Sequence, residues 1–309
     1  MCYSAMAKQS WRKYMRDFGA RIDIKEYIKR FWDRSQGSPY KFPKAMLDAF
    51  SDPQTPDEAE AWALIQQYRE ADALAIQELL FTQKQRLVAA ERKLATKETK
   101  AALNDQRIAT NKIDKAKRDL EDLNRTEPKE RDTRFFPGWY CTVLTEENGE
   151  RIVRPMRYQC RPEGTPAFFD IKYPGTYNAR RDSLGGYWKK LFGYKHGLIV
   201  ATRFYENVEG SDGKNQVVEF TPQTGEDMLI ACLWSHWVDP KGVEPDLYSF
   251  AAITDDPEPE VAAAGHDRTT INIKPEHVDA WLNPQGDLAA MQYIFDDKRH
   301  PFYEHRLAA

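Results

Sequence analysis

A cysteine at the second position offers the most reactive chemistry in this chain, which opens Met1-Cys2-Tyr3. Methionine aminopeptidases remove Met1 when the next residue is small, and the mature chain would then begin with Cys2. Such a residue carries an α-amine and a thiol on adjacent carbons, with ordinary pKa values near ~8 and ~8.5. The amine condenses with an aldehyde to an imine, and the thiolate closes on the imine to give a thiazolidine ring. Cys2 is therefore a candidate nucleophile, although a cysteine at this position is more often incidental.

Three polar motifs farther along the chain contain side chains that this chemistry needs. They are Asn178-Ala179-Arg180, Phe204-Tyr205-Glu206 and His266-Asp267-Arg268. Imine formation requires an acid that helps to expel water, and a histidine exchanges protons near neutral pH. Each motif also has an ordinary interpretation: Asn178 as a turn cap, Glu206 as a surface charge, and His266 as an exposed loop residue. No single motif decides between the two.

The composition is that of a globular protein of 309 residues, with 41% hydrophobic residues and a formal net charge of -3. This charge excludes a wholly basic nucleic-acid coat protein, but it leaves room for a local basic groove. The cysteines lie far apart, so we expect neither a metal site nor a cofactor. The sequence lacks a long apolar run and a signal peptide, and we expect a cytoplasmic protein with reduced thiols and no membrane partner.

The elements that must position these residues fall into zones of different texture. Residues 3–55 carry aromatic side chains at roughly helical spacing, which predicts a helical N-terminal segment. Residues 134–284 contain short apolar or alternating stretches, at 139–144, 197–201, 216–220 and 249–254, and these predict strands. Glu147-Asn148-Gly149-Glu150 predicts a hairpin turn, and the acidic, proline-rich residues 255–260 predict a loop. We expect residues 285–309 to be a peripheral segment.

Residues 56–133 predict a long helical arm, because strong helix formers dominate and no glycine or proline occurs between Pro56 and Pro128. Apolar side chains recur at heptad-like spacing, as Leu80, Leu87, Leu94, Ala101 and Ile108, and then as Ile113, Ala116, Leu120 and Leu123. This pattern predicts a helical hairpin with an antiparallel coiled-coil seam and a turn at Asn104-Asp105. The charged faces of the arm are either simply solvated or contact a protein partner or a second copy of the chain.

Together, Cys2 and the three motifs resemble the SRAP family (SOS-response-associated peptidase), the abasic-site-sensing proteins, in residue type and in order. Further similarity lies in Arg134-Phe135-Phe136-Pro137-Gly138, Met156-Arg157-Tyr158, residues 250–254 and Trp281-Leu282-Asn283-Pro284. The resemblance covers residues 1–2 and 134–284, which would form the catalytic core. It implies an α+β fold with an open, barrel-like β core and flanking helices, into which residues 3–55 and 56–133 are inserted.

The resemblance also implies a role for each matching residue. Cys2 would be the covalent nucleophile, and Asn178 would orient the Cys2 end or the opened sugar. Glu206 would move protons around the amine and imine, and His266 would act as acid or base. The DNA-binding residues would be Arg180, Arg268 and Arg157.

The chain departs from the family pattern beside these residues. Tyr3-Ser4 stands where the family has Gly-Arg, Asn207 replaces a tryptophan, and Thr269-Thr270 replaces Met-Pro. An arginine suited to phosphate and an aromatic ring suited to stacking on a base are thereby lost. The departures affect the expected DNA surface more than the expected chemistry.

The sequence predicts a DNA-repair enzyme that captures abasic sites in single-stranded DNA through Cys2, as a thiazolidine DNA–protein crosslink. This lyase-like activity would accompany peptidase-like processing of its own N-terminus. One alternative is a thiol peptidase that acts on other proteins. Another is a non-enzymatic coiled-coil scaffold that carries a degenerate SRAP module.

Overall fold

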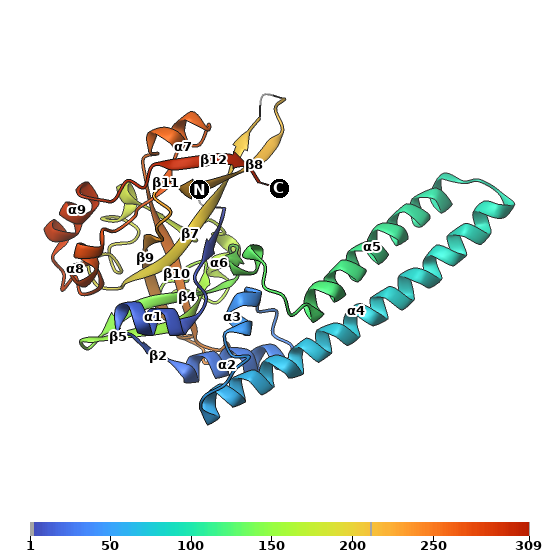
Figure 1. The fold of residues 1–309 in the computed structure, drawn as a ribbon, viewed down its shortest axis with the longest axis horizontal. Coiled ribbons are helices and arrows are strands. Elements are labelled where there is room, and N and C mark those ends of the chain that lie inside the picture. The colour runs from blue at the N-terminus through green and yellow to red at the C-terminus, as the bar shows by residue number, and fades with distance from the viewer. Residues whose placement is uncertain (1–2, 211, 309) are drawn as a thin grey trace.

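A computed structural model of the chain describes residues 3–210 and 212–308. A curved sheet with flanking short helices forms the body, and a long helical hairpin projects from one side (Figure 1). This arrangement confirms the predicted α+β class. No helix in the described residues has both the length and the apolar character needed to cross a lipid bilayer.

The strands of the described residues belong to one sheet. They are β1 (Ser4–Ala7), β2 (Arg21–Ile22), β3 (Arg134–Phe135), β4 (Tyr140–Glu147), β5 (Glu150–Tyr158), β6 (Asn178–Arg180), β7 (His196–Glu209), β8 (Asn215–Pro222), β9 (Met228–Trp237), β10 (Leu247–Asp255), β11 (Thr269–Thr270) and β12 (Tyr303–Leu307). The four stretches predicted as strands lie within or across β4, β7, β8 and β10. The predicted hairpin joins β4 to β5, with Asn148 and Gly149 both at positive φ, as a two-residue hairpin turn requires.

The helices of the described residues mostly cover the outside of this sheet or form the arm. They are α1 (Trp11–Phe18), α2 (Ile24–Ser35), α3 (Lys44–Asp48), α4 (Pro56–Thr96), α5 (Lys100–Asn124), α6 (Phe169–Lys172), α7 (Pro259–Ala263), α8 (Val278–Leu282) and α9 (Leu288–Asp296). Short 3₁₀ turns add Glu130–Thr133, Arg181–Ser183 and Pro275–His277.

The sheet curls back on itself without forming a regular barrel. β9 pairs with both β7 and β10, β10 pairs with β5, β5 with β4, and β4 returns to β7. The β4–β7 contact is short, Leu144 opposite Leu198 and Thr145 opposite Gly197. A Cβ on Gly197 would lie 3.0 Å from Leu144 O and 3.1 Å from Cys232 Sγ. Glycine therefore allows the backbones to approach closely where the sheet closes.

Along β9, both faces of the curved sheet are buried, each against its own apolar cluster. Leu229, Ala231 and Leu233 pack with the helices outside, whereas Ile230 and Cys232 pack in the interior. A strand buried on both faces has a continuous apolar sequence, so alternation does not mark it. The interior cluster lies between the strands that carry the candidate site.

The N-terminal and C-terminal segments contribute strands to the sheet, which the sequence did not predict. β1 lies between β3 and β7, antiparallel to both. β12 pairs with β8 along five register positions, from Tyr303 opposite Pro222 to Leu307 opposite Val218. The helices α1, α2 and α3 lie in residues 3–55, as the aromatic spacing predicted.

The arm is a helical hairpin, but the predicted turn at Asn104-Asp105 is wrong. α4 ends at Thr96 and α5 begins at Lys100, so the turn comprises residues 97–99. The Thr99 hydroxyl accepts a hydrogen bond from the Ala102 N–H and caps α5. The two helices pack along small side chains at heptad spacing, with Ala102, Ala109 and Ala116 buried. Leu80, Leu87 and Leu94 are only half-buried.

Candidate functional site

Glu206 lies on the strand that pairs with the start of the described chain. β7 carries Glu206, and β1 runs antiparallel beside it with Ser4 opposite Tyr205. The backbone N–H of Tyr3 donates to Tyr205 O at 3.1 Å. Cys2, the predicted nucleophile, lies outside the described residues. The residue that follows Cys2 is thus held next to Glu206 in the sheet.

Glu206 and His266 form a buried pair from distant parts of the chain. His266 follows α7, and its Nε2 lies 3.3 Å from Glu206 Oε2, with side chains 9% and 1% exposed. Burial raises the pKa of Glu206 well above its ordinary value and lowers the pKa of His266. Both shifts favour the uncharged forms, a carboxylic acid beside a neutral imidazole.

The surroundings of His266 assign its tautomer. Nδ1 lies 2.9 Å from Arg268 O and 3.3 Å from Arg268 N. A ring nitrogen cannot donate and accept at once, and the shorter contact makes Nδ1–H the donor to the carbonyl. Nε2 then presents a lone pair to Glu206, whose carboxylic acid can donate to it. The pair therefore holds an acid proton next to a base.

Asn178 shares a cavity with His266. β6 runs parallel to β10 with Asn178 opposite Ala252. The Asn178 Oδ1 accepts from the Tyr158 hydroxyl at 3.2 Å, whereas its buried Nδ2 makes no hydrogen bond within the described residues. Asn178 and His266 both line a cavity of about 540 Å³. A buried amide donor without a partner at a cavity wall is suited to hold a polar ligand atom.

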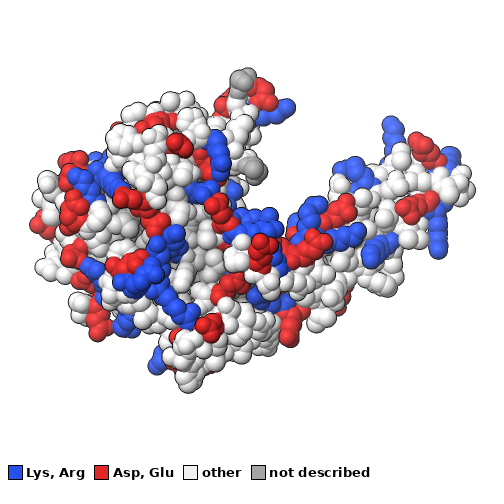
Figure 2. Space-filling model, in the orientation of Figure 1, with Lys and Arg blue, Asp and Glu red and all other residues white. Residues whose placement is uncertain are grey.

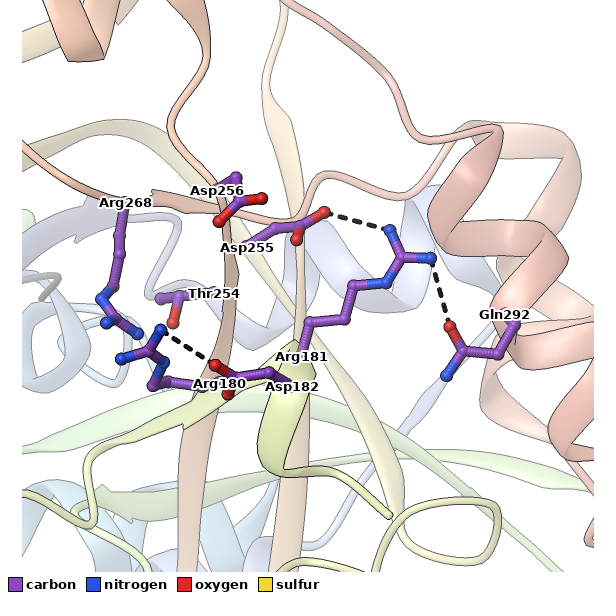
Figure 3. Close-up of a pocket in the computed structure, with 8 residues that line it drawn as sticks. All are labelled: Arg180, Arg181, Asp182, Thr254, Asp255, Asp256, Arg268 and Gln292. Atoms are coloured by element: carbon purple, nitrogen blue, oxygen red, sulfur yellow. Dashed lines mark hydrogen bonds and ion pairs between the residues drawn. The ribbon is translucent and has the colours of Figure 1, made fainter. Parts of the chain in front are cut away.

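Arg180 and Arg268 line this cavity and also an adjoining one of about 400 Å³. Figure 3 shows their guanidinium groups close together, while Arg181 points away toward Asp255. Arg180 pairs with Asp182 at 2.9 Å, but both side chains are more than half exposed and the pair contributes little. Two neighbouring guanidinium groups at an open cavity can bind phosphate, although Asp182, Asp255 and Asp256 line the same cavity.

The structure does not bring Arg157 to the lining of either cavity. Its Nη2 lies 2.6 Å from Asp170 Oδ2, and Asp170 also accepts from Arg161. Arg157 is thus held in an ion-pair network that fixes the segment before β6.

Sequence reasoning assigned no role to two residues of this site. Tyr158 orients the Asn178 side chain, and Thr254 lines both cavities. Tyr158 stands in the Met156-Arg157-Tyr158 stretch, but only the packing of β5 and β6 against β10 brings it to Asn178. No spacing in the sequence reveals that contact. Within the described residues, His, Cys, Asp and Glu side chains form no cluster of three that could hold a metal ion.

Comparisons with solved structures give remote likenesses, of which three are described. A protein from Bacteroides thetaiotaomicron is 15% identical, with a TM-score of 0.49 over 57% of this chain and 78% of that chain. A protein from Bordetella bronchiseptica is 19% identical, with a TM-score of 0.46 over 57% and 87%. A phage-related protein from Bordetella bronchiseptica is 18% identical, with a TM-score of 0.43 over 60% and 85%. These scores carry no argument about function, and no curated protein matches the chain.

The comparison with protein families gives the decisive match. The model described as SOS response associated peptidase (SRAP) matches residues 94–305. This range is more than half of the 309 residues and contains Asn178, Glu206 and His266. The chain therefore belongs to the SRAP family and is a DNA-damage-associated protein of that family.

Proposed function

We propose that this protein captures abasic sites in single-stranded DNA by forming a thiazolidine between Cys2 and the sugar aldehyde. The observation that carries the proposal is the Glu206–His266 pair, buried at 3.3 Å beside the strand that begins the described chain. A proton donor and a base at the start of the chain are what an N-terminal aminothiol needs to react with an aldehyde. Arginines at the adjoining cavity provide for a phosphate backbone.

The proposed reaction balances with the loss of one water. The Cys2 amine attacks the aldehyde carbon of the opened sugar and gives a carbinolamine. Glu206, held as the acid, protonates the departing hydroxyl and water leaves. The resulting iminium returns its N–H proton to Glu206, which gives the neutral imine. The Cys2 sulfur then bonds to the imine carbon, and the thiol proton passes to the nitrogen through the Glu206–His266 pair. Asn178 would hold an oxygen of the opened sugar.

Single-stranded DNA is the preferred substrate in this proposal because its nucleotides are accessible without unpairing a duplex. The same nucleophile and proton-transfer groups would serve the peptidase-like removal of Met1. The proposal thus assigns one set of residues to both activities.

The test is an intact-mass measurement after mixing the protein with an oligonucleotide that carries an abasic site. We expect the mass of the protein, without Met1, to rise by the mass of the oligonucleotide less one water. Cys2→Ala should abolish the heat-stable adduct, and Cys2→Ser should leave at most a labile imine. Cys160→Ala is the matched control, because Cys160 is a buried free thiol that should not react. A wild-type yield of heat-stable adduct from Cys2→Ala would exclude the mechanism.

A further inference from the structure

Arg134 is a half-buried arginine beside the start of the described chain, and neither the predicted nor the described site includes it. Its Nε and Nη2 donate to Ser4 Oγ at 3.1 and 3.0 Å. Its guanidinium lies 3.6 Å from the centroid of the Tyr205 ring and 5.0 Å from that of Phe136. Arg134 forms no ion pair with a carboxylate in the described part of the chain. A partly desolvated guanidinium held in place without an acid partner is prepared to bind an anion.

The charges around Arg134 leave an excess of positive charge. By strand register, Arg134, Ser4 and Tyr205 share one face of the sheet with Arg203 and Glu219. The Glu219 carboxylate is already shared: it accepts from the Tyr205 hydroxyl at 2.9 Å and from Arg203 at 3.1 Å.

Arg306 also donates to Glu219, at 2.8 Å. The other nearby acid is Glu130, which is 76% exposed and 3.3 Å from Arg203. Among the described residues of this face, three arginines thus face two acids, and Arg134 is the arginine that pairs with neither carboxylate.

This face of the sheet is opposite to the face that carries the Glu206–His266 pair. Tyr205 and Glu206 are consecutive on β7, so their side chains point to opposite faces. A ligand attached at the chain start, next to Glu206, would reach Arg134 by passing over the first residues of β1.

Aromatic rings lie beside Arg134 and the first residues of β1. Tyr3 is 37% exposed, and its ring contacts that of Phe136 edge-on with centroids 5.8 Å apart. Phe136 in turn contacts Trp139 at 5.3 Å, and the Lys41 Nζ stands 6.0 Å from the Trp139 centroid. Aromatic rings interleaved with cations are typical of surfaces that bind single-stranded nucleic acid by stacking and charge.

We propose that Arg134, with Phe136 and Tyr3, forms a subsite for a phosphate and base of the DNA strand that flanks the captured nucleotide. The inference rests on the proposed function and extends it. Arg134 donates to Ser4, the position at which the family pattern has an arginine. Arg134 thus places a cation at this position, although it belongs to a different strand. The rings of Tyr3 and Phe136 restore the stacking surface that Asn207 lacks.

The test measures noncovalent binding of a single-stranded oligonucleotide with a tetrahydrofuran abasic analogue, which has no aldehyde and cannot crosslink. Arg134→Gln should weaken binding roughly fivefold at low salt and reduce the slope of log affinity against log salt by about 0.7, the loss of one phosphate contact. Arg306→Gln is the matched control: it removes the same charge from the same face, but from a side chain that already donates to Glu219, and its slope should stay at the wild-type value. Phe136→Leu should weaken binding about fivefold or more with an unchanged slope.

A methylphosphonate scan locates the phosphate. Neutralising one linkage beside the abasic position should weaken binding to the wild-type protein but not to Arg134→Gln. Where Arg134→Gln fails to fold by circular dichroism, Arg134→Met, which keeps an unbranched stem on the Tyr205 ring, makes the same comparison. If Arg134→Gln or Arg134→Met shows the wild-type salt slope and the wild-type methylphosphonate profile, the inference is overturned. This holds even when the wild-type protein forms its adduct. Failure of the wild-type protein to form any adduct with a natural abasic oligonucleotide would instead refute the proposed function itself.

Discussion

Burial distinguishes Glu206 from the many exposed glutamates of this chain. Its side chain is 1% exposed, and this burial raises its pKa, so the group keeps its proton where an ordinary glutamate has lost it. The neighbouring His266 is kept neutral by its own burial. A neutral acid and a neutral base in contact can give up one proton while taking up another, so the pair keeps zero net charge in an apolar site. The chemistry expected of the pair thus depends on how deeply β1 and the loop before β11 enclose it.

We predict that Glu206→Gln stabilises the fold increasingly as pH rises. The folded state retains the Glu206 proton above the ordinary value of 4.5, whereas the unfolded chain releases it there. Wild-type stability is therefore lost as pH rises from about 4.5. A glutamine does not titrate, and His266 contributes similarly to both proteins.

The measurement is the free energy of unfolding by urea, from pH 4 to pH 8, for both proteins. The difference, variant minus wild type, should grow with pH. The control is Glu163→Gln, which makes the same substitution at a glutamate in an exposed loop. A difference for Glu206→Gln that falls with rising pH would show that Glu206 is held as a carboxylate.

At the scale of single residues, the sequence identifies the candidate site residues but not their protonation states. The motifs singled out Asn178, Glu206 and His266, and the structure places Asn178 and His266 at one cavity with Glu206 beside His266. The protonation of Glu206 could not be read from the sequence, because it depends on long-range burial. Arg134 occurs in the Arg134-Phe135-Phe136-Pro137-Gly138 motif, but only the three-dimensional structure shows that it has no carboxylate partner within the described residues.

The elements were predictable where the pattern is local. Helices with strong propensity and the Asn148-Gly149 hairpin are encoded in neighbouring residues, and both occur in the structure. β1 and β12 are strands because distant strands pair with them, and a short segment such as Ser4–Ala7 has no alternation to indicate this. β1, the strand that begins beside Glu206, was for this reason not predicted.

We predict that Gly197→Ala destabilises the protein by about 1–3 kcal/mol, the usual cost of overpacking. The new Cβ would lie 3.0 Å from Leu144 O, a backbone atom that cannot rotate away, and 3.1 Å from Cys232 Sγ. The strain falls where β4 meets β7 and closes the sheet. Gly185→Ala is the matched control, since its Cβ would meet no atom within 4 Å. Urea unfolding of both variants is the measurement, and equal stabilities would show that the β4–β7 contact is loose.

At the scale of the whole molecule, the arm divides into a base and a tip. The base of α4 belongs to the body: Ala61, Ile65 and Tyr68 are buried in the same apolar cluster as residues of α2 and α3. Beyond the base, α4 and α5 contact mainly each other, and Figure 2 shows positive and negative side chains interspersed along the exposed surface of the tip. The helical propensity that predicted the arm is uniform along its length, so the sequence did not show where body ends and projection begins. The turn escaped prediction because residues 97–99 contain neither glycine nor proline.

This division predicts different results for two deletions of the arm. Replacing residues 77–115 with a short Gly/Ser linker should leave the body folded and still able to capture an abasic site, because Arg69 still donates to Leu123 O and holds α5 against the base. Replacing residues 56–127 should destabilise the protein by several kcal/mol, because it removes Ile65 and Tyr68 from the core at about 1.5–3 kcal/mol each. Thermal unfolding and the intact-mass adduct assay measure the two effects. If the shorter deletion folded with wild-type stability but formed no adduct, the tip of the arm would have to contact the DNA, and the catalytic unit would extend well beyond the curved sheet.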